Sequence, residues 1–195
     1  MTIFYIFFKI EYNINMKTKI KFIILNSILV FFIAFLGHFI YEISENNIFA
    51  IFFPVNESIW EHMKLLFTPY IIDILIIYLI SKKFNIVYHN FLFSALFSAT
   101  FSIFLYLTIY LPIYNIFGHN SIFAIILMYI VIFISQLFQI YILKKEEFRL
   151  SKFSFVLIIA IYIIFGYLTY YPIRNYIFYD FNKNLYGKNI YILGN

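Results

Sequence analysis

The chain has 195 residues and a formal net charge of +5 at pH 7, with 64% hydrophobic and only 12% charged residues. A soluble domain of this length needs a largely polar surface, so the composition excludes a water-soluble globular fold and predicts that lipid surrounds the protein. The absence of cysteine excludes disulfides, thiolate catalysis and metal sites built from cysteine.

The amino-terminal stretch, residues 1–15, is apolar over too few residues to span a bilayer. Met16 and the alternating lysines that follow it are typical of a natural start before an inserted helix. We therefore expect residues 1–15 to be either a misassigned start or a segment that lies in the membrane interface.

Long apolar runs predict the fold class. About 20 apolar residues span the hydrocarbon layer, and backbone groups in lipid must be hydrogen-bonded within their own segment, which favours helices. We expect an all-α transmembrane bundle, with one integral membrane domain over residues 16–171 and an extracytoplasmic tail over residues 172–195. The predicted spans are Phe22–Tyr41, Leu65–Ile80, Phe91–Leu111, Ile122–Leu143 and Phe153–Tyr171.

Basic residues predict the orientation of these spans, since cytoplasmic loops of membrane proteins are enriched in lysine and arginine. Most of them precede the first span, follow the second or lie between the fourth and fifth, so we expect a cytoplasmic amino terminus in a cell membrane. They form no patch suited to a groove, and we expect no nucleic-acid partner. The residues on the predicted cytoplasmic side are Lys17, Lys19, Lys21, Lys82, Lys83, Lys144, Lys145, Arg149 and Lys152.

Ionisable side chains concentrate between His38 and His62, where the first span ends and the second begins. His38 and Glu42 are four residues apart and project from one helical face, and Glu57 and Glu61 have the same spacing. Imidazoles and carboxylates at one level suit zinc, iron or manganese. We predict a divalent metal held by His38, Glu42, Glu61 and His62, with Glu57 as the catalytic base.

A structural interpretation accounts for part of this segment. Ser58 and Glu61 fit a capping box, in which each side chain accepts a hydrogen bond from the backbone of the other. Trp60 stands where an interfacial anchor is expected. This interpretation leaves four ionisable residues unexplained: His38, Glu42, Glu57 and His62.

Asp73 lies inside the second predicted span, where a charge is costly and a functional role is the default hypothesis. No lysine or arginine lies in the predicted spans to pair with it, so we expect Asp73 to be protonated or to bond neighbouring polar side chains. The candidates for that contact are Ser94, Ser98, Gln136 and Gln139.

Ser94, Ser98 and Ser102 place small residues at intervals of four along the third span. Such a stripe lets helices approach closely. It predicts helix packing within the chain or, as an alternative, an oligomer formed through this face.

Three strings, "GHFIYE", "PVNESIWEHMKLLFTP" and "FYDFNKNLYG", resemble an uncharacterised family of small multi-pass bacterial membrane proteins, a domain of unknown function. The resemblance extends from about Lys19 to Gly187 and supplies no activity. It implies that the second string is one motif, with His38 and Glu42 as its companion. We count Asn56 and Trp60 of that motif, with Asp73, as candidate binding residues.

Three functions stay open at this stage. The first is a metal-assisted hydrolase that acts on a lipid or lipid-linked substrate at the extracytoplasmic face. The second is a carrier or binding protein for a cation, a proton or a small polar solute, using Asp73. The third is a non-catalytic membrane partner in which the motif clasps the first two helices.

Overall fold

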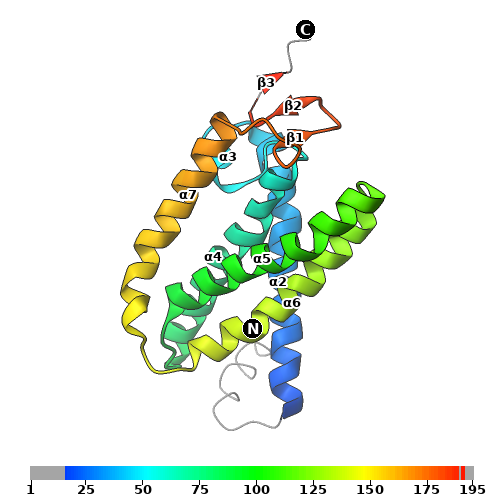
Figure 1. Ribbon diagram of the computed structural model, residues 1–195. Helices are drawn as coiled ribbons and strands as arrows, with labels where there is room; N and C mark the ends of the chain where they lie inside the picture. Colours follow the sequence, from blue (N-terminus) through cyan, green and yellow to red (C-terminus); the bar gives the residue numbers. More distant parts are fainter. Residues whose placement is uncertain (1–15, 189, 192–195) are drawn as a thin grey trace.

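The computed structural model describes residues 16–188 and 190–191 and contains five helices long and apolar enough to cross a membrane (Figure 1). The predicted all-α, multi-pass fold is thus confirmed, while the predicted extension over residues 1–15 lies outside the described residues. The five helices are α2 (Met16–Ser44), α4 (Ile59–Phe84), α5 (Phe91–Phe117), α6 (Ser121–Leu143) and α7 (Ser154–Tyr170). A short 3-10 helix, η2 (Arg149–Phe153), comes directly before α7.

The helix α4 begins well before the predicted span. The Ser58 hydroxyl caps it by accepting a hydrogen bond from the Glu61 amide at 3.3 Å. The second half of the expected capping box is absent, because the Ser58 amide donates to Asn56 Oδ1 at 2.9 Å instead. Lys64 consequently lies inside the second membrane helix, which corrects the expectation that the spans contain no lysine.

The core forms where α4 packs against α2 and α5, and α6 packs against both of these helices. Apolar side chains on the outer surfaces, such as Phe104, Ile122 and Ile163, are exposed. Exposed residues of this kind on helices of spanning length are those that contact lipid. The bilayer is therefore the environment of the five-helix bundle.

The serine stripe of α5 faces the interior of the chain. Ser94, Ser98 and Ser102 are fully buried, and the Ser102 hydroxyl donates to the Leu66 carbonyl of α4 at 3.0 Å. The stripe therefore packs against α4, and it is not a surface through which a second chain could bind.

A buried polar cluster joins three helices around Asp73. Its Oδ2 accepts hydrogen bonds from Asn26 Nδ2 at 3.1 Å and from Gln139 Nε2 at 2.9 Å. Of the candidate partners, Gln139 thus bonds Asp73 directly, whereas Gln136 joins the cluster through Asn26, which donates to its Oε1 at 2.9 Å.

Asp73→Ala is expected to lower the free energy of unfolding by about 1–3 kcal/mol, because it removes the acceptor from two buried donors. Asp73→Asn keeps a carbonyl oxygen at this position, so its free energy of unfolding is expected to fall much less. Unfolding of both variants by denaturing detergent measures the difference. Equal stability of the alanine variant and the wild type would contradict a cohesive role for the cluster.

The carboxyl-terminal tail folds over one end of the bundle (Figure 1). It forms a small antiparallel sheet in the order β1 (Tyr179–Asp180), β2 (Leu185–Tyr186) and β3 (Ile190–Tyr191), close to the short helix α3 (Phe49–Phe52). In the β1–β2 pair, Tyr179 is opposite Tyr186 and Asp180 is opposite Leu185.

Contacts with the motif fix this tail in place. The Trp60 amide donates to the Ile177 carbonyl at 2.9 Å, and the Trp60 ring stacks on Phe178 with 4.9 Å between centroids. Asn56 Nδ2 donates to the carbonyl of Gly187 at 2.9 Å. Gly187 has a positive φ of 48°, and a Cβ atom there would collide with the Thr169 carbonyl, so this contact requires glycine.

Candidate metal centre

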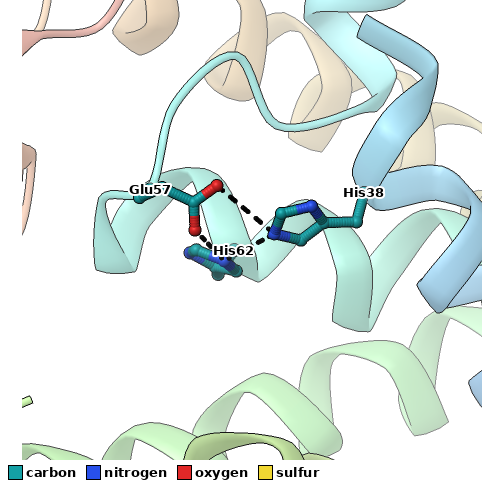
Figure 2. Close-up of side chains that lie close together, drawn as sticks. All are labelled: His38, Glu57 and His62. Carbon is teal, nitrogen blue, oxygen red and sulfur yellow. Dashed lines mark hydrogen bonds and ion pairs between the residues drawn. The ribbon is translucent and has the colours of Figure 1, made fainter. Parts of the chain in front are cut away.

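Two imidazoles and one carboxylate converge at the end of the bundle that carries the sheet. His38 extends from α2, His62 from the first turns of α4, and Glu57 from the loop just before α4 (Figure 2). The two Nε2 atoms are 3.3 Å apart. The Glu57 oxygens lie 3.5 Å from His38 Nε2 and 3.4 Å from His62 Nε2.

The protonation pattern of His62 makes it suitable as a ligand. Its Nδ1 lies 2.9 Å from the Ser58 carbonyl, which can only accept, so Nδ1 carries the hydrogen. In the neutral ring this leaves a lone pair on Nε2, aimed at the Glu57 carboxylate and at His38. A proton or a cation between these atoms would satisfy the lone pairs that face one another.

The three separations match the spacing of zinc ligands. Zinc–nitrogen and zinc–oxygen bonds of about 2.0–2.1 Å at tetrahedral angles place ligand atoms about 3.3–3.4 Å apart. The observed separations are 3.3, 3.4 and 3.5 Å. One carboxylate and two histidines also leave a fourth tetrahedral position for water or substrate, as catalytic zinc sites do.

Glu57 is held as an anion in a fixed position. Without a metal, hydrogen bonds that the protonated Nε2 atoms of His38 and His62 donate keep the pKa of its carboxyl well below the ordinary value. Its backbone amide donates to Asp180 Oδ2 at 3.0 Å, and Asp180 Oδ1 accepts from the amides of Asn182 and Lys183. The fully buried Asp180 therefore ties the loop that carries Glu57 to the sheet.

Two cavities meet at this cluster. One, of about 300 Å³, is lined by tyrosines of α5 and of the tail, and the other, of about 370 Å³, by apolar residues of α2, α4 and α6. Glu57, His62, Tyr106, His119 and Ala124 line both. Glu57 and His62 are thus within reach of a small molecule from either cavity.

The other residues of the predicted metal set lie elsewhere. The group of ligand atoms within 4.8 Å of one another comprises His38, Glu57 and His62. Glu42 is exposed and lies 4.0 Å from Lys183. Glu61 is buried and pairs with Lys64, whose Nζ lies 2.6 Å from Glu61 Oε2.

Of the predicted binding residues, Asn56 and Trp60 hold the tail, and Asp73 lies in the buried cluster of α2, α4 and α6. His119, just before α6, lines both cavities, and its Nδ1 lies 2.8 Å from the Tyr110 hydroxyl. Sequence reasoning missed Asp180 as the support for Glu57. The "FYDFNKNLYG" string, which contains it, was the available signal.

Comparison with known proteins places this chain in a family. A model described as a family of unknown function, DUF6512, matches residues 10–188. No curated protein and no solved structure matches the chain. The match includes the loop of Glu57, both histidines and the tail residues that support them. The chain therefore belongs to the DUF6512 family of unknown function.

Proposed function

We propose that His38, Glu57 and His62 bind one divalent metal, zinc by preference, and that the protein is a metal-assisted hydrolase of a lipid or lipid-linked substrate. The observation that supports this most directly is the convergence of two imidazole nitrogens and the two oxygens of one carboxylate at separations of 3.3–3.5 Å. The hydrogen bond from His62 Nδ1 also leaves Nε2 of that ring free to bind a metal. Histidine and carboxylate ligands with an open position are typical of catalytic zinc.

The chemistry of such a site is hydrolysis. A bound metal lowers the pKa of its water, which supplies a hydroxide nucleophile near neutral pH, and it polarises the carbonyl or phosphoryl group under attack. Glu57 contributes ligand charge in this proposal, in place of the separate base role predicted from the sequence. His119, an imidazole that lines both cavities, is a candidate to supply a proton to the leaving group.

The location of the site supports a lipid substrate. His38 and His62 lie at the ends of membrane helices, and the apolar cavity lies among those helices. Most basic residues are at the opposite ends of the helices, which supports an extracytoplasmic position for the site in a cell membrane.

The test is hydrolysis of ester lipids in mixed micelles by the full chain loaded with zinc. We expect a chelator to abolish turnover and added zinc to restore it. The Glu57→Gln and His62→Ala variants are both expected to lose turnover. The matched control is His89→Ala, an exposed histidine at the opposite end of the bundle, which is expected to retain activity. Zinc binding without chelator-sensitive turnover of any lipid would overturn the hydrolase function.

Asp180→Ala is expected to weaken zinc binding about 10–100-fold, the usual cost of losing a group that orients a ligand. The substitution removes the acceptor for the Glu57 amide and frees the loop that carries the carboxylate. Asn182→Ala is the control, because its backbone amide remains available to Asp180. Competition with a chromophoric chelator measures both affinities, and an unchanged affinity in the Asp180 variant would remove its positioning role.

A second candidate function, carriage of a proton or cation by Asp73, is supported by two buried acceptors. Asp73 Oδ1 and Gln139 Oε1 have no hydrogen-bond partner among the described residues. Uptake by proteoliposomes that Asp73→Asn leaves unchanged would contradict this candidate.

A further inference from the structure

We propose that the substrate is a neutral ester lipid, with its acyl chain in the apolar cavity and an uncharged, hydroxyl-bearing head group in the tyrosine-lined cavity. This inference rests on the proposed hydrolase function and names the substrate of the same site. It follows from the lining, the openings and the shared wall of the two cavities.

The apolar cavity has the form that an acyl chain requires. Its volume is about 370 Å³, and Phe31, Phe35, Leu65, Ile125 and Met128 contribute to its lining. Phe35 and Ile125, from α2 and α6, are each 52% exposed on surfaces of spanning helices. The cavity therefore opens between these helices toward lipid, and a chain can enter it from within the bilayer.

The second cavity suits a polar head without charge. Tyrosines from α5 and from the tail line its volume of about 300 Å³, together with Asn182. Phenol rings offer apolar faces to the carbon skeleton of a polyol, and their hydroxyls hydrogen-bond its oxygens. The lining tyrosines are Tyr106, Tyr110, Tyr114, Tyr176 and Tyr179.

Charge in the two cavities opposes an anionic head group. Among the described residues that line them there is no lysine or arginine, the side chains that proteins use to bind phosphate. Glu57 and Asp180 line the tyrosine-lined cavity, and the metal that Glu57 would hold offsets the charge of its carboxylate. A phosphate there would lack a cationic partner other than the metal, whereas a glycerol or sugar head needs none.

The residues that line both cavities indicate where the scissile bond of the substrate would lie. Glu57 and His62 line both cavities, so the junction of head and chain lies beside the metal. At an ester junction, the oxygen of a water activated beside these residues would form a bond to the carbonyl carbon, and the bond from that carbon to the alkoxy oxygen would break. One proton of that water would pass through His119 to the alkoxy oxygen, and a fatty acid and an alcohol would leave.

The test compares two lipids that differ by one phosphate group: monooleoylglycerol and monooleoylglycerol phosphate, each presented in neutral detergent micelles to the zinc-loaded full chain. We expect deacylation of the neutral lipid to be at least about tenfold faster in kcat/KM, because no lysine or arginine among the described lining residues replaces the water that a phosphate loses on binding. Tyr176→Ala, a half-exposed head-cavity residue, is expected to raise KM for the neutral lipid and leave zinc binding intact.

The outcomes separate this inference from the function on which it rests. Deacylation of the phosphate lipid at an equal or higher rate would overturn the neutral head group and leave the hydrolase standing. Hydrolysis of the neutral lipid that Tyr176→Ala leaves unchanged would overturn the placement of the head. Zinc binding with no turnover of either lipid would count against the hydrolase itself.

Discussion

Replacement of Lys64 by methionine is expected to lower the free energy of unfolding by about 3–5 kcal/mol, the cost of leaving one partner of a buried ion pair uncompensated. Lys64 is fully buried, and Glu61 is 1% exposed. The Lys64 ammonium uses all three of its hydrogens, donating to Glu61 Oε2, the Ala50 carbonyl and Thr169 Oγ1 at 2.6–2.7 Å. Without it, the Glu61 carboxylate loses the cation with which it pairs.

A second substitution at Glu61 is expected to restore stability to the Lys64 variant. Glu61→Gln combined with Lys64→Met removes both charges and is expected to recover much of the loss, since a neutral pair of similar volume carries no desolvation penalty for charge. Lys83→Met, at an exposed cation near the other end of α4, is the control. Unfolding in denaturing detergent measures all three variants. Wild-type stability in Lys64→Met would mean that the pair contributes nothing to the fold.

Replacement of His62 by alanine is expected to weaken zinc binding by more than the roughly 10–100-fold expected for Asp180→Ala. Asp180 would only orient a ligand residue, whereas His62 would supply a ligand atom. The Nε2 atom of His62 lies within 3.3–3.4 Å of both other ligand residues, so no tetrahedral set remains without it. Competition with a chelator gives the affinity.

The controls for this substitution separate metal binding from folding. His89→Ala removes an exposed histidine at the other end of the bundle and is expected to bind zinc as the wild type does. A His62→Ala protein that unfolds more easily but binds zinc equally well would assign His38, Glu57 and His62 to a structural clasp between α2 and α4.

The helices were predictable because lipid imposes one requirement on every span. Apolar runs such as Phe91–Leu111 and Ile122–Leu143 reappear within α5 and α6. The start of α4 was harder to place, because its first turns carry polar residues. Ser58 caps the helix early, and Glu61 and Lys64, three residues apart, then face the same buried side. Because Lys64 was expected in the loop before this span, its ion pair with Glu61 was not predicted.

The candidate site was predictable in part. The ends of two adjacent spans had to bring His38 and His62 to one level, and their Nε2 atoms lie 3.3 Å apart. The roles of the glutamates did not follow from spacing, since Glu57 precedes α4 and the interval of four to Glu61 is not a helical one. The Glu57 carboxylate, in the loop before α4, can turn toward the histidines, whereas the Glu61 carboxylate forms an ion pair with Lys64.

The tail was the least predictable element. Its strands are two residues long, too short for an alternating pattern, and Asp180 acts on Glu57 across 123 positions of sequence. Only the shared string around Asp180 indicated that the tail belongs with the motif of α4.

The measurement that tests the metal centre most directly is zinc X-ray absorption on the detergent-purified full chain, incubated with zinc and desalted. We expect one zinc per chain with nitrogen and oxygen neighbours at about 2.0–2.1 Å and the outer scattering of two imidazoles. The His38→Ala, His62→Ala double variant is expected to lose that zinc. Protein that retains no zinc after desalting, or a zinc environment unchanged in the double variant, would contradict the site.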